Sequence, residues 1–292
     1  MVTPFAADLS PDAGKLVKQC RWLISQDVGL AVFGTNSEAN SLSVGEKKTL
    51  LDALVDGGLP VERLMPGTGC CALTDTVDLT RHAVKQGVSG VLMLPPFFYK
   101  GVSDDGLFAS YAEIIERVGD DRLRIYLYHI PPVSQVPITL PLIERLLKAY
   151  PGTIAGIKDS SGDWSNTNAM LEQFQSEQFD VFAGSETFLL ATLRGGGAGC
   201  ITATGNVNPG PIAALYRSWQ QADADEQQKR LDTIRGIFAR FSMIPALKAA
   251  IAHFSGDADW GAVRPPLVKL TPQASAELVD ALKQAGFTMP GL

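Results

Sequence analysis

The feature that most constrains the fold of this chain is a regular alternation of short apolar runs with longer amphipathic stretches. The runs are apolar almost throughout, which is typical of strands covered on both faces, as in a parallel sheet. Val2 and Thr3 add the remnant of a further strand at the start. The seven longer runs lie at residues 29–33, 63–66, 90–94, 124–128, 153–157, 180–183 and 199–202.

The stretches between the runs have the period of amphipathic helices. One such stretch, residues 44–55, follows Ser43. Another covers residues 74–86, where Thr74 can cap the first turn and Gly87 follows the last turn. Eight βα units within about 215 residues predict an α/β fold of the (β/α)8 barrel type. We favour the barrel over a doubly wound sheet, which usually has fewer strands.

Beyond residue 206 the strand patterns stop and only helical ones continue, at 211–220, 224–238, 244–253 and 272–286. We therefore predict two parts. Residues 1–206 form the barrel, with a truncated first strand, and residues 207–292 form a helical C-terminal extension packed on it. The charged stretch at 223–230 is interpreted as the solvated face of a helix start.

Composition narrows the class of partner. A net charge of -6 and a pI near 5.1 argue against a general nucleic-acid or anionic-membrane surface, and fit small metabolites better. We expect no membrane span and no signal peptide. The cysteines have neither metal-site spacing nor the density of a disulfide scaffold, which favours the reducing cytoplasm. They are Cys20, Cys70, Cys71 and Cys200.

Chemistry in a barrel is expected where the carboxyl ends of the strands converge. The predicted strand ends carry one amine, one phenol and several hydroxyl groups, and no metal-binding triad is evident. We therefore expect neither a metal nor another cofactor. These strand-end segments are 34–38, 95–99, 128–132, 158–161, 184–186 and 202–206.

Lys158 ends the apolar run 153–157, where a partly desolvated amine is suited to attack a ketone. The alternative is a strand-end lysine that reaches solvent. An imine-forming lysine needs a proton donor and acceptor, and the Tyr128 phenol, relayed by the Thr35 hydroxyl, suits that task. The loop at 34–36 can donate hydrogen bonds to a carboxylate. A 2-oxo acid supplies both the ketone and the carboxylate.

Four motifs in this order resemble the dihydrodipicolinate synthase / N-acetylneuraminate lyase family. They are GTNSE at 34–38, YHIP at 128–131, GIKDS at 156–160 and FAGS at 182–185. The resemblance runs from Val2 to about residue 260. It implies a pyruvate-dependent class I lyase that is a homotetramer in most members, and Lys158 as its Schiff-base lysine. Relatives have several more residues in the first strand. We therefore expect that the given sequence is trimmed at its start or that the true start lies upstream.

The resemblance also assigns the other site residues. Tyr128 is the phenol that moves protons. Thr35 and Asn36 hold the pyruvyl carboxylate and link it to that phenol. Ser160, two places after the lysine, contacts substrate in the 4-hydroxy-2-oxoglutarate aldolase branch, to which this chain is closest in motif. Further expected substrate contacts are Gly184, Glu186 and the backbone carbonyl of Ile201.

Some of these assignments stay open. Glu186 either holds substrate hydroxyls or is a solvated strand-end carboxylate. Asp159 either orients the site or caps the following turn. His129 alternates to the other side of its strand from Tyr128 and is interpreted as structural, as are two arginines, Arg194 and Arg264.

Three positions depart from the synthases of this family. Those enzymes carry an arginine five residues after the catalytic tyrosine, where this chain has Val133. They use a second tyrosine, from a neighbouring subunit, at the position of Phe98, so the proton relay is either shortened or rerouted through Tyr99. Ser37 replaces the usual loop glycine. The chain is thus not a typical dihydrodipicolinate synthase.

We predict an aldolase that cleaves or forms a 4-hydroxy-2-oxo acid, with pyruvate and an aldehyde as partners. One alternative is a dehydratase of 2-oxo-3-deoxy sugar acids that uses the same imine. Another is a synthase-like barrel with altered or lost activity. The sequence does not identify the aldehyde.

Overall fold

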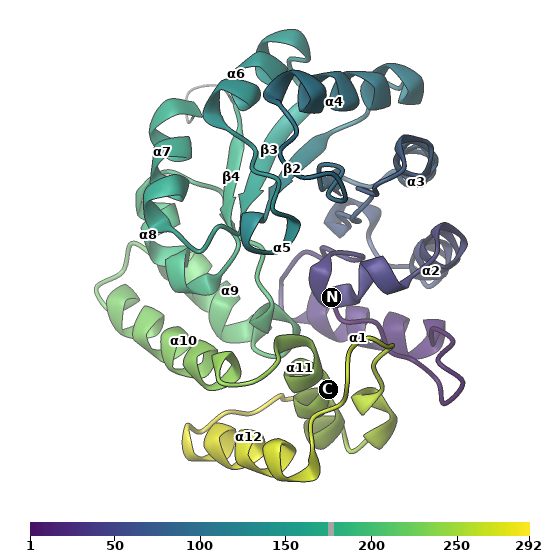
Figure 1. Cartoon of the computed structure of the whole chain (residues 1–292). Helices are drawn as coiled ribbons and strands as arrows, with labels where there is room; N and C mark the ends of the chain where they lie inside the picture. The colour runs from purple at the N-terminus through teal and green to yellow at the C-terminus, as the bar shows by residue number, and fades with distance from the viewer. Residues whose placement is uncertain (175–177) are drawn as a thin grey trace. The chain divides into compact units, whose positions relative to one another are not determined.

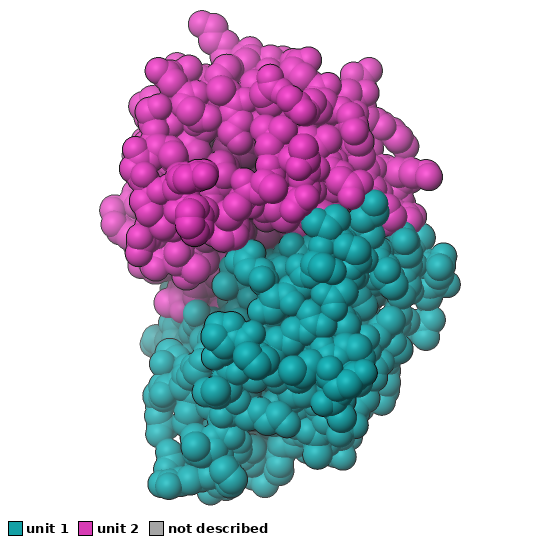
Figure 2. Space-filling model, turned by 45° about the vertical axis from the view of Figure 1, so that its right-hand side comes forward, with its two compact units in different colours: residues 1–59, 202–292 teal, residues 60–201 magenta. Residues whose placement is uncertain are grey.

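The computed structural model describes residues 1–174 and 178–292, which fall into two compact units. Unit 1 comprises residues 1–59 and 202–292, and unit 2 comprises residues 60–201 (Figures 1 and 2). The division predicted at residue 206 lies inside unit 1 and stays a prediction from sequence pattern.

Unit 2 is built on a parallel sheet whose described strands follow one another in chain order. Every neighbouring pair is parallel, and the spatial order is β1-β2-β3-β4-β5. A doubly wound sheet reverses its strand order at a switch point, whereas a (β/α)8 barrel does not. The strands are β1 Val91–Met93, β2 Ile125–His129, β3 Ile154–Asp159, β4 Asp180–Ala183 and β5 Gly199–Cys200.

Helices alternate with these strands. In Figure 1, α7 lies beside β4, and both α7 and α8 contact that strand. Side-chain caps set two of the helix starts: Ser103 Oγ accepts from the Gly106 N–H at the start of α4, and Thr139 Oγ1 accepts from the Leu142 N–H at the start of α6. The helices are α3 Leu73–Lys85, α4 Asp104–Val118, α5 Pro131–Ser134, α6 Leu140–Ala149, α7 Trp164–Phe174 and α8 Leu189–Arg194, with 3₁₀ turns at Val61–Arg63 and Glu186–Phe188.

The predicted cap of α3 was wrong. The helix begins at Leu73, so Thr74 lies within its first turn, and the capping position is Ala72, which has no side-chain hydrogen bond to give. Helix periodicity located the element, but its first residue depends on the backbone of the preceding segment.

The first three predicted strands are not regular strands in the described residues. In the run 63–66, Pro66 has no N–H to donate, and pairing with β1 reduces to one parallel bridge between Gly67 and Leu92. In the run 29–33, Phe33 turns into the left-handed region, with φ 57°, and ends the extended segment.

The chain start is anchored without a strand ladder. The Met1 amine donates to the Ala31 carbonyl at 3.1 Å, whereas the Val2 N–H donates to the Asn206 side chain at 2.7 Å. Because a side chain takes the place of a neighbouring backbone, Val2 and Thr3 form no regular strand.

Unit 1 combines the first two helices with the predicted C-terminal helices. The helix predicted after Ser43 is α2, and Ser43 caps it in a reciprocal capping box with Glu46. The last four helices match the predicted ones to within two residues at each end. The helices are α1 Ala13–Ser25, α2 Val44–Asp56, α9 Pro209–Ser218, α10 Ala224–Ala239, α11 Met243–Ser255 and α12 Pro272–Gln284, with 3₁₀ turns at Thr35–Ser37, Ala39–Ser41, Thr204–Asn206 and Ala258–Gly261.

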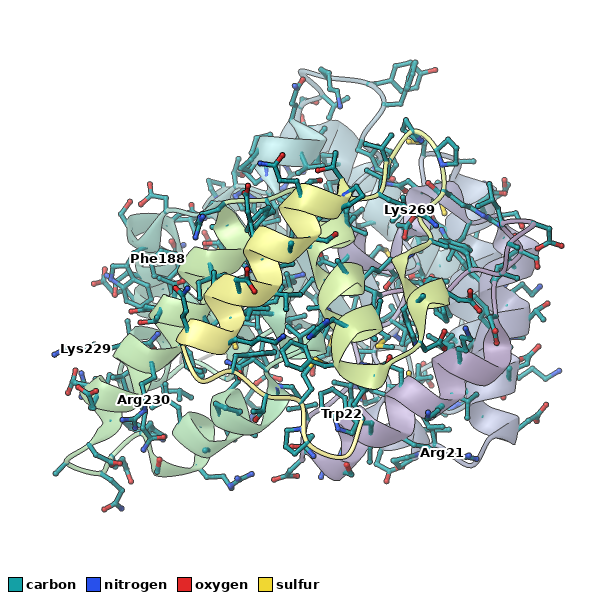
Figure 3. The ribbon with its side chains drawn as sticks, turned by 90° about the horizontal axis from the view of Figure 1, so that it is seen from below. Arg21, Trp22, Phe188, Lys229, Arg230 and Lys269 are labelled. Atoms are coloured by element: carbon teal, nitrogen blue, oxygen red, sulfur yellow. The ribbon has the colours of Figure 1, made fainter. Side chains whose placement is uncertain are left out.

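Within unit 1 the C-terminal segment packs against the start of the chain. The Trp22 indole N–H donates to the Pro290 carbonyl at 2.9 Å, and Figure 3 shows the C-terminal loop passing beside Trp22. Arg217 of α9 pairs with Asp27 at 2.9 Å. The charged stretch is a solvated face, as predicted, since both Lys229 and Arg230 on α10 are exposed and point outward in Figure 3.

No single helix among the described residues is long and apolar enough to cross a membrane. The pair α10 and α11, bent by 107° at its junction, passes the same length and composition criterion only when taken together.

Candidate active site

Lys158 lies on β3, one residue before its end, and its side chain is buried, with a relative exposure of 6%. Tyr128 on β2 is its register partner, so the two side chains project from the same face of the sheet. The ammonium nitrogen lies 4.1 Å from the centre of the Tyr128 ring. The solvent-exposed alternative for Lys158 was therefore wrong, and the predicted amine and phenol are brought together.

Lys158 takes part in none of the ion pairs found in the part of the chain that the structure describes. The face of an aromatic ring attracts a cation, but more weakly than a carboxylate does in a dry environment. An amine in this setting is held in place while its nitrogen remains available for covalent chemistry.

His129 and Asp159 are also register partners, and they project from the opposite face of the sheet. His129 Nδ1 accepts a hydrogen bond from the Ile138 N–H at 2.9 Å, and its Nε2 lies 3.9 Å from Asp159 Oδ1. Burial lowers the pKa of His129, with the Asp159 charge acting against this. These contacts support the structural interpretation of the histidine.

Asp159 receives hydrogen bonds from the segment that leads into α7. Its carboxylate accepts from the Ser161 N–H at 2.9 Å, from the Ser161 hydroxyl at 3.0 Å and from the Thr167 hydroxyl at 2.6 Å. Of the two predicted roles, capping of the turn is the one that the contacts show. The turn in this way fixes the backbone that directly follows Lys158.

Ser160 and Gly184 lie against each other at the ends of β3 and β4. The Ser160 N–H donates to the His129 carbonyl at 2.7 Å, and the Gly184 N–H donates to the Asp159 carbonyl at 2.6 Å. A Cβ atom at position 184 would run into Ser160 Oγ and would lie 2.7 Å from the Asp159 carbonyl oxygen. Glycine is thus required for the two strand ends to approach this closely.

Glu186 is fully buried, which rules out the solvated carboxylate that was one of its two predicted interpretations. Burial raises the pKa of the Cys200 thiol on β5; the Glu186 charge adds to this effect and the Lys158 charge opposes it. Glu186 and Lys158 therefore lie in the same electrostatic neighbourhood. The Ile201 N–H donates to the Ala183 carbonyl at 2.9 Å, which ties the residue whose carbonyl is the predicted contact to the end of β4.

Thr35 and Asn36 belong to unit 1, where they form a 3₁₀ turn with Ser37, and both are half-buried. The Ser37 N–H donates to the Gly34 carbonyl at 3.0 Å and closes the turn. The Ser37 hydroxyl donates to the Met1 carbonyl, and the Thr3 hydroxyl donates to the Ser37 carbonyl at 2.7 Å. The serine that replaces the usual glycine therefore ties this turn to the chain start.

Two of the residues that depart from the synthases, Phe98 and Val133, are exposed in unit 2, and so is Tyr99. Phe98 and Tyr99 have relative exposures of 72% and 73%, and their rings meet edge to face with centroids 5.4 Å apart. Val133, on α5, is 61% exposed. The Lys100 ammonium ties this loop to α5 through the Ser134 carbonyl at 2.7 Å. Whether Tyr99 supplies the hydroxyl that Phe98 lacks stays a prediction.

Sequence reasoning overlooked Lys248. This lysine is fully buried on α11, where it forms an ion pair with Glu38, the residue that ends the predicted carboxylate-binding motif. A single lysine within the otherwise apolar stretch 243–252 was the signal that could have indicated it. Two arginines were interpreted as structural from the sequence. Arg264 pairs with Glu46 at 2.5 Å, and Arg194 is the last residue of α8.

No group of three or more His, Cys, Asp or Glu side chains that could hold a metal ion occurs within residues 1–174 and 178–292. The described site residues offer an amine, a phenol, hydroxyl groups and the buried carboxylate of Glu186.

Comparison with known proteins shows similarity over nearly the whole chain. The model of the dihydrodipicolinate synthetase family matches residues 1–285. An uncharacterized DapA-like lyase of Chloroflexus aurantiacus is 35% identical, over 99% of this chain and 96% of that protein.

Two solved structures are similar at a TM-score of 0.89. Dihydrodipicolinate synthase from Agrobacterium tumefaciens is 29% identical, over 98% of this chain and 97% of that one. YagE, a prophage protein from E. coli K12 solved in complex with pyruvate, is 26% identical, over 98% and 96% of the two chains. Together with the sequential parallel sheet, this similarity confirms the predicted fold class, an α/β (β/α)8 barrel with a helical C-terminal extension.

Proposed function

The chain belongs to the dihydrodipicolinate synthetase family of class I aldolases and lyases, and we propose that it cleaves or forms a 4-hydroxy-2-oxo acid through an imine at Lys158. The observation that carries this proposal is the buried amine at the end of β3, which faces the Tyr128 ring at 4.1 Å and has no ion pair among the described residues.

The proposed reaction begins with attack of the Lys158 amine on the C2 ketone of the substrate, and imine formation releases one water. Removal of the proton from the 4-hydroxyl group breaks the C3–C4 bond. Its electron pair moves toward the imine nitrogen and leaves an enamine, while the aldehyde departs. Protonation of C3 and addition of water then release pyruvate and restore the amine.

Tyr128 is the proposed proton carrier, because its ring already lies against the reacting nitrogen. Ser160 is proposed to contact the substrate beside Lys158, where the missing side chain of Gly184 leaves room for its hydroxyl. The proposed role of Thr35 and Asn36 is to hold the carboxylate. Glu186 is proposed to hold substrate hydroxyl groups, and the Ile201 carbonyl to contact the substrate near Lys158. Thr35 also relays protons to Tyr128 in this proposal.

Val133 supports an aldolase rather than a typical synthase. An exposed valine cannot bind the second carboxylate for which the synthases use an arginine at the corresponding position. Phe98 likewise offers no hydroxyl. Neither residue supplies the group that the synthases use for aspartate semialdehyde, and the motifs are closest to those of the 4-hydroxy-2-oxoglutarate aldolase branch. We also propose that the protein is a homotetramer and that it acts in the cytoplasm. Light scattering of the purified protein would test the oligomeric state.

The decisive experiment is borohydride reduction of the protein with pyruvate, followed by peptide mass spectrometry. We expect a stable adduct on Lys158. Lys148, an exposed lysine on α6, offers a matched control: Lys148→Ala should be modified as the wild type is, and Lys158→Ala should not be. An adduct-forming Lys158→Ala protein would contradict the mechanism.

A panel of 2-oxo acids then identifies the reaction. Release of pyruvate with an aldehyde indicates the aldolase. Loss of water without pyruvate release would assign the same imine to a dehydratase, and pyruvate binding without turnover on any substrate would assign a barrel that has lost activity.

A further inference from the structure

The turn that carries Thr35 and Asn36 ends at Glu38, a residue in an unfavourable backbone conformation. Its φ is 55°, in the left-handed region that non-glycine residues seldom adopt. Its N–H donates to the Thr35 carbonyl at 3.1 Å, so the position of Glu38 and the shape of the turn depend on each other. Such a conformation persists where surrounding contacts impose it.

The contacts that impose it come from the C-terminal extension. The Lys248 ammonium on α11 donates to one carboxylate oxygen of Glu38, and the Arg264 backbone N–H donates to the other at 2.9 Å. Lys248 also donates to the Ala262 carbonyl at 2.6 Å and lies 4.4 Å from the centre of the Phe5 ring. Both partners of this ion pair are fully shielded from solvent.

A buried ion pair of this kind contributes little net free energy to stability, because desolvation of the two charges offsets much of their attraction. Burial indeed lowers the pKa of Lys248, and the bond to Glu38 only partly opposes this. What these contacts do provide is geometric: Lys248 holds one carboxylate oxygen of Glu38 and the Arg264 N–H holds the other, which fixes the residue that closes the turn.

We propose that Lys248 is a positioning residue, which through Glu38 holds the turn of Thr35 and Asn36 in the conformation that binds the carboxylate of the 2-oxo acid. This inference rests on the proposed function for the identity of the ligand. Its structural part, that Lys248 holds the turn, does not.

The test is Lys248→Met, which keeps an unbranched side chain and removes the charge. We expect the KM for the 2-oxo acid, and the pyruvate concentration for half-maximal borohydride trapping, to rise about tenfold or more, with kcat at saturation changed less than about threefold. Hydrogen exchange at the amides of residues 35–38 should become faster. Unchanged KM and unchanged exchange would overturn the proposal.

Lys15→Met is the matched control, because Lys15 on α1 of the same unit pairs with Asp257 at 2.8 Å near the surface. It should change neither KM nor exchange at residues 35–38. A similar effect of both substitutions would show a general loss of stability and would contradict a specific role for Lys248.

Glu38→Gln provides a second variant, since it removes the partner's charge and keeps its shape. It should reproduce the rise in KM and the faster exchange, and unfolding of both variants would assign the pair to stability and overturn the proposal. If wild-type protein traps no pyruvate, the proposed function fails. The exchange measurement still decides whether Lys248 holds the turn.

Discussion

Two buried lysines in this protein have opposite surroundings. Lys248, in unit 1, has a carboxylate and a carbonyl as hydrogen-bond partners, whereas Lys158, in unit 2, faces an aromatic ring and has no ion pair among the described residues. Burial of an ammonium group is costly in both places. The lysine that is paired with a carboxylate holds a turn in our proposal, and the lysine without an ion pair is the proposed nucleophile.

The largest predicted effect tests this difference directly. Lys158→Ala should lower kcat at least about 1000-fold, because the variant lacks the amine that is proposed to form the imine. Lys248→Met should still form the adduct on Lys158 at saturating pyruvate. Steady-state kinetics and trapping on the two purified variants check the prediction, and a Lys248→Met protein that lost the adduct altogether would remove the distinction between the two lysines.

Tyr128→Phe sharpens the account of the Lys158 surroundings. The variant keeps the ring against the ammonium nitrogen and loses only the hydroxyl group. We therefore expect kcat to fall about 100-fold, as for the loss of a general acid–base. Imine formation should become slower and still reach completion in a borohydride time course. A wild-type rate would assign the proton transfers to another group.

Gly184→Ala tests how closely the strand ends of unit 2 must approach. The added methyl group would meet Ser160 Oγ and the Asp159 carbonyl, so we expect a loss of about 1 to 3 kcal/mol in unfolding free energy and reduced activity. Gly236 on α10 has no atom within 4 Å of an added Cβ, and Gly236→Ala should be neutral or stabilise by about 0.5 to 1 kcal/mol. Urea denaturation measures both, and equal effects would contradict the steric argument.

The smallest effect concerns the ion pairs of unit 1. The Arg264 guanidinium, which bonds to the Glu46 carboxylate at 2.5 Å, lowers the pKa of Glu46 to about 2. The folded protein binds this proton less readily than the unfolded chain, so the stabilisation is complete above about pH 4.5 and is lost as the pH falls toward 2.

Glu46→Gln should therefore lower the unfolding free energy by about 1 to 2 kcal/mol at pH 7, with the difference from wild type shrinking below about pH 4.5. Denaturation at a series of pH values checks this. A difference that persists unchanged at low pH would show that the loss comes from the capping geometry and not from the charge.

The residues of the candidate site in unit 2 could largely be predicted from the sequence. An apolar run that ends on an amine and a second that ends on a phenol suffice, since parallel strands bring their carboxyl ends to one edge of the sheet. The register of Tyr128 with Lys158 agrees with that expectation. The burial of Glu186 could not be predicted, because a carboxylate after a strand end has no local pattern that distinguishes a buried position from a solvated one.

The first strands of the predicted barrel show a second limit. The apolar run 29–33 has the composition of a strand, but φ at Phe33 is positive, and the chain start bonds to the side chain of Asn206. Hydrophobic periodicity reports which residues are buried. It does not report whether a backbone N–H donates to a strand or to a side chain.

The sequence by itself determined the chemical groups, the parallel α/β architecture and the amine at a strand end, because these follow from local periodicity and residue type. Only the tertiary structure decided that Lys248 forms an ion pair, whereas Lys158 forms none among the described residues. Glu38 and Lys248 are separated by 210 positions, and no local pattern joins residues so far apart. Their pairing exists only once α11 has packed within unit 1, and that packing distinguishes the lysine that supports the turn from the lysine proposed to react.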